Sequence, residues 1–148
     1  MLLSNLNSKS LAIVGYQALT AKLLLKQLLP RANQPILLIN LASNPKRRDH
    51  FVNDVFFTVE ERELMKERIR FVTVGELKEV VEGSPQKAID VLFSLYESVD
   101  FSNRDKMIDN HLLVTSALTS ALSKIPIKKC LLLSSIYLKD AGYVGEDD

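Results

Sequence analysis

The stretch LAIVGYQALTAKLLLKQLLP, residues 11–30, decides the fold class of this chain. It opens with the continuous apolar run Leu11–Val14, which ends at Gly15 and is typical of a strand buried on both faces. An amphipathic helix is predicted next, because apolar residues follow at the helical spacing 0, 3, 4 and 7 and the pattern stops before Pro30. The apolar residues of this helix are Ala21, Leu24, Leu25 and Leu28.

The same alternation of strand and helix continues along the chain. Further strands are predicted at 36–39, 70–74, 89–95 and 130–133. The apolar spacing of residues 52–59, the capping-box pattern Thr58–Glu61 and the Ser84-Pro85 pair each indicate a helix, and a longer helix is expected before Pro126. This alternation predicts an α/β fold, a doubly wound parallel sheet of about five strands with helices on both faces. Residues 1–148 contain no internal repeat or linker and are expected to form a single domain.

Length and composition exclude several classes of protein. A chain of 148 residues has room for one domain that buries enough surface to fold without disulfides or metals. Hydrophobic residues make up 47% and charged residues 25%, which excludes a disordered or fibrous chain. The 19 basic and 18 acidic residues give a net charge of +1, so we expect no nucleic-acid partner.

Individual residues exclude a disulfide and argue against a metal site and a membrane span. Cys130 is the only cysteine, which excludes an intramolecular disulfide and favours an intracellular protein of the cytoplasm or of an organelle interior. His50 and His111 lie far apart in the sequence, so no metal site is expected. The most apolar stretch, residues 11–29, is interrupted by lysines and glutamines, so no membrane span is expected.

The candidate site is expected at one edge of the predicted sheet. In a doubly wound sheet, ligands bind beyond the carboxyl ends of the strands. The residues that follow predicted strands include Gly15, Gly75, Tyr96 and the Ser134-Ser135 pair. Gly15 begins the turn into the first helix, and the backbone of such a turn is where a nucleotide phosphate approaches the chain.

Several short motifs match one known family in order and spacing. Gly15, Ala18 and Ala21 have the spacing of the glycines in T-G-x-x-G-x-x-G. Residues 71–77, FVTVGEL, are similar to a strand followed by G-D-L, and residues 132–137, LLSSIY, are similar to V-S-T-A-Y. The sequence resembles the extended short-chain dehydrogenase/reductase superfamily, and within it the NAD(P)-binding Rossmann domain of fatty acyl-CoA reductases and thioester reductases. The resemblance covers the chain from about Leu11 to Tyr137.

This resemblance implies a Rossmann-like domain that binds NADP or NAD. It assigns cofactor contacts to the first turn, to a basic NADP-selecting segment, to Glu76 in the place of an aspartate that faces the adenine, and to Tyr96. The turn residues are Gly15, Tyr16, Gln17, Ala18 and Ala21, and the basic segment is Lys46, Arg47 and Arg48. Asn110 and Ser135 resemble an asparagine and a catalytic serine or threonine of the family, as remnants of its active site.

Two departures from the family pattern bear on activity. Ala18 and Ala21 replace glycines, and the Ala18 methyl group is expected to lie where a pyrophosphate would approach the backbone. The family's catalytic Tyr-x-x-x-Lys would come after the end of this chain, because Tyr137 and Tyr143 have an alanine and an aspartate four residues later. Without that lysine, a tyrosine keeps too high a pKa for proton transfer near neutral pH.

Each of these residues also has a purely structural interpretation. Gly15 would let the chain leave its strand, Ser135 would bond locally at a strand end, and Asn110 would be a buried amide. The Lys46–Arg48 segment would be a solvated loop. Cys130, inside a strand, is expected to be a small buried apolar residue.

Three functional hypotheses follow. In the first, the chain is a degenerate, truncated and non-catalytic domain that acts as an accessory or interaction subunit, in a homo-oligomer or a larger assembly. An end at Asp148 would leave the fifth strand as an apolar sheet edge in need of a partner. In the second, it is an NADP-dependent reductase, similar to fatty acyl-CoA reductases, that needs a second chain or a longer product to supply the tyrosine and lysine. In the third, it is a fragment of a full reductase.

Overall fold

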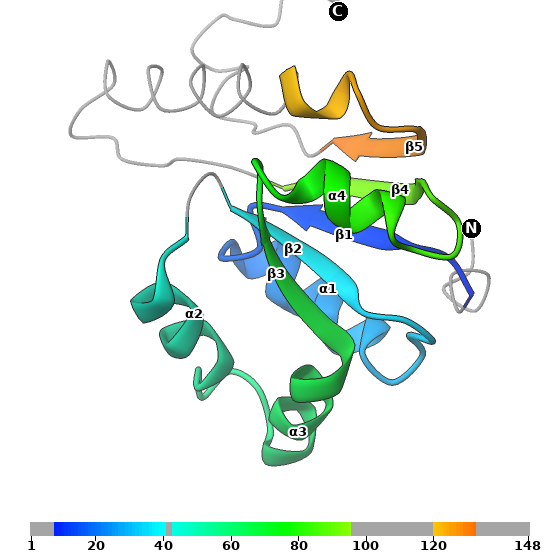
Figure 1. Cartoon of the computed structure of the whole chain (residues 1–148). Coiled ribbons are helices and arrows are strands. Elements are labelled where there is room, and N and C mark those ends of the chain that lie inside the picture. The colour runs from blue at the N-terminus through cyan, green and yellow to red at the C-terminus, as the bar shows by residue number, and fades with distance from the viewer. Residues whose placement is uncertain (1–7, 41–42, 96–119, 133–148) are drawn as a thin grey trace, which may run out of the picture.

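The computed structural model describes residues 8–40, 43–95 and 120–132, and it contains a five-stranded sheet with every pair of neighbouring strands parallel (Figure 1). The strand order is β3-β2-β1-β4-β5. The strands are β1 Leu11–Val14, β2 Ile36–Asn40, β3 Ile69–Thr73, β4 Ile89–Ser94 and β5 Ile127–Leu132. The helices are α1 Leu19–Leu28, α2 Pro45–Val52, α3 Val59–Arg68 and α4 Leu77–Glu82.

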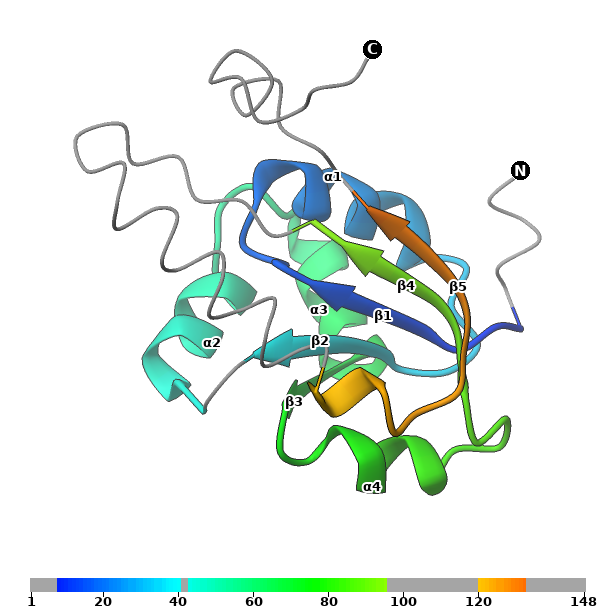
Figure 2. The same cartoon turned by 90° about the horizontal axis from the view of Figure 1, so that it is seen from above.

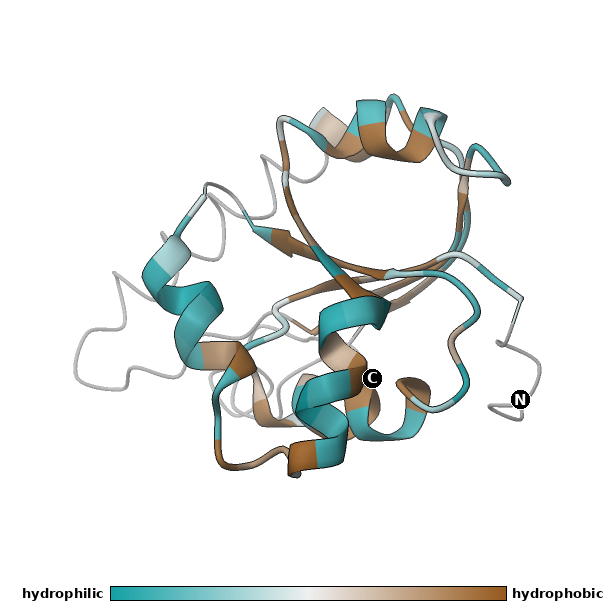
Figure 3. Ribbon diagram, turned by 60° about the horizontal axis from the view of Figure 1, so that its bottom comes forward, coloured by the Kyte–Doolittle hydropathy of each residue, from teal (hydrophilic) through white to brown (hydrophobic). Residues whose placement is uncertain are grey.

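Helices lie on both sides of the sheet, as the alternating pattern predicts (Figures 2 and 3). One core cluster joins the sheet to α1 and α3 and contains Leu25 and Met65. The other joins the opposite face to α4 and contains Leu77 and Val81. The Rossmann-like, doubly wound parallel sheet expected from the sequence is therefore confirmed. The order 3-2-1-4-5 places β1 at the centre, where all four of its residues are buried.

The segment between α2 and α3 corrects one prediction. The apolar spacing of residues 52–59 indicates a single helix, but α2 ends at Val52 and α3 begins at Val59. Asp54 accepts a hydrogen bond from the Phe56 N–H at 2.9 Å and also binds Lys22 of α1, so its side chain holds a turn where a helix would continue. Val55, a member of the expected apolar stripe, is 91% exposed as a result.

The capping box predicted at Thr58 is confirmed. The Thr58 hydroxyl accepts a hydrogen bond from the Glu61 N–H at 3.1 Å, and the Glu61 carboxylate accepts one from the Thr58 N–H at 2.8 Å. The box satisfies N–H groups that a helix start leaves without partners. It therefore sets the first residue of α3 even though the apolar pattern suggests an earlier start.

A second correction concerns residues 74–88. The Ser84-Pro85 pair indicates a helix start, whereas the structure has α4 at Leu77–Glu82 and bends after it. The Ser84 hydroxyl donates to the Val81 carbonyl at 2.7 Å and accepts from the Lys87 N–H at 3.1 Å. Ser84 therefore closes the end of α4 instead of opening a new helix. Of the longer helix expected before Pro126, residues 120–122 are helical, and the earlier part lies outside the described residues.

Strand β5 corrects the expectation for Cys130 and for the sheet edge. Cys130 is exposed, not buried, because within the described residues β5 pairs with β4 alone and lies at the edge of the sheet. Its neighbours Lys128 and Lys129 are exposed as well. The described part of β5 is therefore not the apolar edge that the composition of residues 130–133 predicts, and its lysines are a common protection against unwanted strand pairing.

At the amino ends of the strands, a buried carboxylate ties three strands together. Asp90 of β4 is 7% exposed and accepts a hydrogen bond from the Ser10 N–H at 2.9 Å, next to β1. Its other oxygen lies 3.2 Å from the Lys128 ammonium group of β5. The Ser10 hydroxyl accepts from the Asp90 N–H at 2.9 Å and donates to the Ala88 carbonyl at 2.7 Å. Burial alone would raise the pKa of Asp90, but the Ser10 N–H and Lys128 outweigh it, and the pKa is lowered.

We expect Asp90→Asn to lower the free energy of unfolding at pH 7 by about 1–2 kcal/mol, because a charged acceptor of two contacts is lost. Since the folded state lowers the pKa of Asp90, this contribution is present above the group's ordinary value of 3.8 and is lost as the pH falls through the folded pKa. Urea unfolding of both proteins between pH 7 and pH 2 measures it. A gap that stays constant to the lowest pH would contradict the assignment. Glu63→Gln, in an exposed pair with Lys66, is the control with a small effect.

Candidate functional site

The turn between β1 and α1 requires a glycine. Gly15 has a φ of 79°, in the left-handed region that side chains disfavour. The Ala18 N–H donates to the Gly15 carbonyl at 3.1 Å and closes the turn. The chain leaves the centre of the sheet here, where the strand order runs to β2 and β3 on one side and to β4 and β5 on the other. Such a switch in strand order marks the ligand-binding crevice of doubly wound sheets.

Among the described residues, no side chain caps the start of α1, which faces this crevice. The N-cap residue is Ala18, which has no polar side chain to accept from the first-turn N–H groups. The first turn also lacks an acidic residue. Free N–H groups and the positive end of the helix dipole together favour an anion. A phosphate is the anion that such a turn binds in nucleotide-binding proteins.

The two alanines of the turn lie against the core. Ala21 is fully buried within the cluster beneath α1, which is the close helix–sheet contact expected for the third glycine position. Ala18 is half-buried and also packs against this cluster. The Ala18 methyl group therefore has core contacts.

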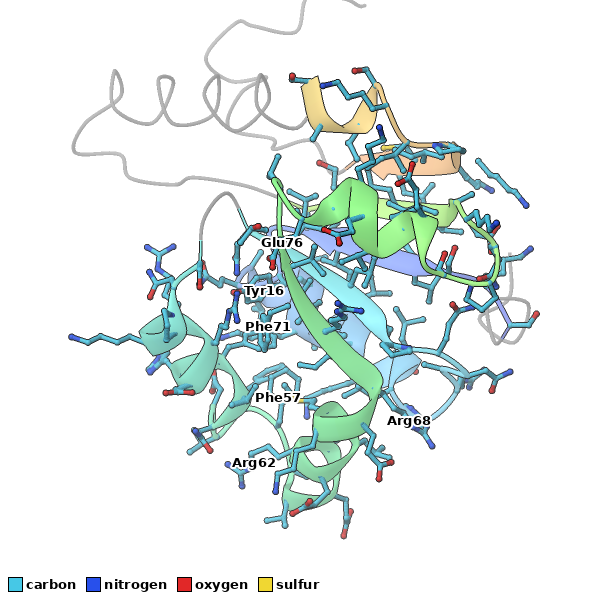
Figure 4. The ribbon with its side chains drawn as sticks, viewed as in Figure 1. Tyr16, Phe57, Arg62, Arg68, Phe71 and Glu76 are labelled. Atoms are coloured by element: carbon cyan, nitrogen blue, oxygen red, sulfur yellow. The ribbon has the colours of Figure 1, made fainter. Side chains whose placement is uncertain are left out.

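Tyr16 lies inside the protein beneath the turn. It is 1% exposed, and its ring makes edge contacts with Phe51 of α2 and Phe71 of β3 at centroid distances of 4.8 and 5.5 Å (Figure 4). Burial raises the pKa of Tyr16, while the side chain of Asn40 and the charge of Arg48 act against the rise. Tyr16 thus joins the turn to α2 and β3 through an aromatic cluster.

A groove of about 540 Å³ lies between this turn and α2. Arg47 donates to the Gln17 side-chain oxygen at 3.4 Å across it, and the Arg47 N–H is capped by Asn44. Lys22 pairs with Asp54 at 2.7 Å, and this pair lowers the pKa of Asp54. The groove carries more basic than acidic side chains. Its lining is Gln17, Lys22, Lys46, Arg47, His50, Phe51 and Asp54.

The structure divides the basic segment into two parts. Lys46 and Arg47 are exposed and line the groove together with Gln17. Arg48 is half-buried and points elsewhere, because its guanidinium carbon lies 5.4 Å from the centre of the Phe71 ring. The segment is the first turn of α2 and not a loop.

Glu76 lies at the carboxyl end of β3 (Figure 4). Its carboxylate accepts from the Thr73 N–H at 3.0 Å and from the Thr73 hydroxyl at 2.9 Å. The two hydrogen bonds from Thr73 lower the pKa of Glu76. At the other end of β3, the Ile69 N–H donates to the Met65 carbonyl of α3. Two N–H groups of this edge strand are therefore occupied within the protein.

Asn40 is a candidate residue that the sequence reasoning did not select. It is the last residue of β2 and therefore lies at the same edge as Gly15 and Glu76. Dinucleotide-binding proteins carry a ribose-contacting residue near this end of the second strand. The signal in the sequence is that a polar residue directly follows the apolar run at 36–39.

Three of the predicted site residues lie outside the residues that the structure describes. Tyr96, Asn110 and Ser135 belong to segments that the structure does not describe, so their roles remain predictions. Within residues 8–40, 43–95 and 120–132, no group of three or more His, Cys, Asp or Glu side chains is placed to hold a metal. The helices in these same ranges are too short or too polar to cross a membrane.

We expect Gly15→Ala to lower the free energy of unfolding by about 1–2 kcal/mol, because a side chain disfavours the left-handed backbone at this position. Gly75→Ala is the matched control at the same edge: its added carbon meets the Thr73 hydroxyl at 3.9 Å, an ordinary contact. Chemical unfolding of the two variants compares them directly. If Gly15→Ala lost no more free energy of unfolding than the control Gly75→Ala, the turn would tolerate a side chain.

Comparison with known proteins adds no relative: no family model, no curated protein and no solved structure matches this chain.

Proposed function

We propose that this domain binds an adenine dinucleotide, NADP in preference to NAD, at the carboxyl edge of its sheet. The observation that carries the proposal is the left-handed Gly15 turn, which leads from the central strand into the uncapped start of α1. This combination supplies a close approach to the backbone and a positive helix end for a pyrophosphate. The resemblance of the sequence to NAD(P)-binding reductases supports the same ligand class.

The residues around the turn fit such a ligand. Lys46 and Arg47 line the groove beside Gln17 and would hold an additional phosphate of NADP. Ala18 stands where a glycine is usual, but its methyl group packs against the core cluster, which supports its compatibility with a nearby phosphate. Glu76 and Asn40 stand at the ends of β3 and β2, where adenine and ribose contacts are made in such folds.

The proposed role is that of an accessory or interaction subunit. The outer strands of the described sheet are β3 and β5. Two N–H groups of β3 are occupied by Glu76 and by the end of α3. By contrast, β5 pairs with β4 on one of its two sides. This difference favours β5 over β3 as the edge that meets another chain, provided that the partner places acidic side chains opposite Lys128 and Lys129. The partner is a second copy of this chain or another subunit.

The alternative is an NADP-dependent reductase, similar to fatty acyl-CoA reductases, that uses the same groove. It requires a tyrosine–lysine pair from a second chain or from further sequence, because Tyr137 and Tyr143 have Ala141 and Asp147 four residues later. The same groove residues favour it, so ligand binding alone does not separate the two functions. Reduction of an acyl thioester by NADPH, assayed with and without the recovered partner, does separate them.

The nucleotide proposal is tested by thermal unfolding with NADPH and NADH. At a hundredfold excess over Kd, a ligand that binds only the folded state stabilises it by about 2.7 kcal/mol. We expect a rise in Tm with both ligands and a larger rise with NADPH at equal concentration. The absence of a rise at millimolar nucleotide would overturn the proposal.

The groove residues are tested by the double substitution Lys46→Ala and Arg47→Ala. We expect the Kd for NADPH to rise about tenfold, as loss of two exposed charged contacts implies, with a smaller change for NADH. Isothermal titration calorimetry measures both constants. Lys66→Ala on α3, an exposed lysine outside this groove, is the control and should leave both unchanged. An equal loss for the two nucleotides would remove Lys46 and Arg47 as NADP-selecting residues.

The subunit proposal is tested through Cys130, which is exposed on β5 and is the only cysteine of the chain. We expect a mass above that of the monomer at micromolar concentration, or a partner recovered by pull-down. A cysteine-to-lysine cross-linker attached at Cys130 should join the two chains. Cys130→Ser removes the attachment site and serves as the control. A stable monomer with no recovered partner would contradict the proposal.

A further inference from the structure

A second groove lies along β3, an outer strand of the described sheet, between the end of α2 and α3. Its volume is about 400 Å³, and it shares no lining residue with the groove beside the Gly15 turn. Phe71 of β3 and Arg62 of α3, both labelled in Figure 4, belong to its lining. We call it the β3 groove. Its complete lining is Val52, Asn53, Val59, Arg62, Glu63, Met65, Lys66, Ile69 and Phe71.

The floor of the β3 groove is apolar and is fixed by the core. Met65 is fully buried in the core cluster beneath α1 and α3. Val52, Ile69 and Phe71 are half-buried and pack against the same cluster. The Phe71 ring also contacts the Phe51 ring edge-on, at a centroid distance of 6.3 Å. Such a floor exists before a ligand arrives, so binding does not have to order it.

Apolar surface continues from the groove onto the turn before α3. Val59 lines the groove and is 67% exposed. Val55 is 91% exposed and belongs to the turn that joins two lining residues, Asn53 and Val59. Contiguous exposed apolar surface marks interaction sites, whereas scattered apolar residues do not. A cavity of this size holds a small molecule, but a polypeptide segment also covers the valines beside it.

The charged side chains of the groove favour a segment of negative charge. Glu63 pairs with Lys66 at 3.1 Å, so these two charges offset each other. Arg62 is half-buried and takes part in no ion pair among the described residues. Two cations and one carboxylate leave the lining with a net charge of +1. A guanidinium group binds a carboxylate through two parallel hydrogen bonds, so the complementary partner carries an aspartate or a glutamate.

We propose that the β3 groove binds an acidic peptide segment of another protein, with an apolar side chain on the groove floor and a carboxylate on Arg62. The segment binds through side chains and not as an added strand, because α3 and Glu76 occupy the N–H groups of Ile69 and Thr73 at the two ends of β3. This contact goes beyond the nucleotide function and does not depend on it, since the two grooves have no residue in common.

The probe is a random peptide display library selected against the full chain. We expect the selected peptides to combine an apolar residue with an aspartate or a glutamate. Each one is then synthesised with a fluorescent label, and its Kd is measured by fluorescence anisotropy. A selection without this combination of residues would contradict the proposal.

The deciding variant is Arg62→Glu, which reverses the charge at the groove. We expect the Kd of the selected peptides to rise about tenfold or more, because a charge-assisted hydrogen bond is replaced by repulsion. Exchange of the peptide's acidic residue for lysine should restore binding to this variant and weaken binding to the natural protein. Arg31→Glu makes the same change in net charge at an exposed arginine outside the groove, and it should leave the Kd unchanged. Equal effects of the two substitutions would overturn the proposal.

Val59→Ser tests the apolar contact. We expect the Kd to rise about fivefold, because the peptide loses methyl groups that it covers. Leu23→Ser is the matched control, at a residue of α1 that is 51% exposed and lies outside the groove. Both positions are exposed, so the Tm of each variant should stay close to that of the natural protein, which separates a loss of binding from a loss of folding. An unchanged Kd in Val59→Ser would remove the apolar part of the site and overturn the proposal.

A second copy of this chain is the competing occupant of the β3 groove. Light scattering of the free protein and of Arg62→Glu, over a range of concentrations, distinguishes the two. We expect the same mass for both proteins, because the groove binds a different polypeptide. A dimer that Arg62→Glu dissociates would assign the groove to a second copy and overturn the proposal.

Discussion

The left-handed turn at Gly15 is the constraint on which the rest of this structure depends. β1 is the central strand and is buried on both faces, so the chain must leave the sheet abruptly at its carboxyl end. A glycine with a φ of 79° permits that change of direction. The same turn aims the start of α1 at the crevice where the strand order reverses. This turn thus determines both the packing of α1 on the sheet and the direction in which the amino end of the helix points.

The two ends of the sheet differ in how well their polar groups are satisfied. At the amino ends, Asp90, Ser10 and Lys128 form a closed set of hydrogen bonds and an ion pair that joins three strands. At the carboxyl ends, the buried Tyr16 hydroxyl lies within hydrogen-bonding reach of the Asn40 side chain, but no comparable set of contacts joins three strands within the described residues. The closed set of polar contacts therefore lies at the end of the sheet opposite to the Gly15 turn.

The outer strands of the described sheet are also unlike each other. Glu76 and the end of α3 occupy N–H groups of β3, so the carboxylate that the family resemblance assigns to adenine also protects a sheet edge. In the part of β5 that the structure describes, exposed lysines protect the edge. An edge guarded by charge accepts a partner of complementary charge, whereas an edge whose donors are used internally does not. The proposed association of this domain follows from that asymmetry.

Local patterns in the sequence were sufficient for the parts of the structure that local physics controls. Leu11–Val14 is a strand because four consecutive apolar residues fit only a buried strand or a buried helix, and a glycine follows at once. The α3 start follows from the capping box at Thr58, whose hydrogen bonds span three residues. The break between α2 and α3 depends in part on a distant residue, since Asp54 is held by Lys22 of α1. The tertiary structure alone decided that Tyr16 is buried, that Cys130 is exposed and that Asn40 stands beside the Gly15 turn. The order of strands in the sheet sets these neighbours, and that order depends on the sum of long-range contacts, which no short stretch of sequence encodes.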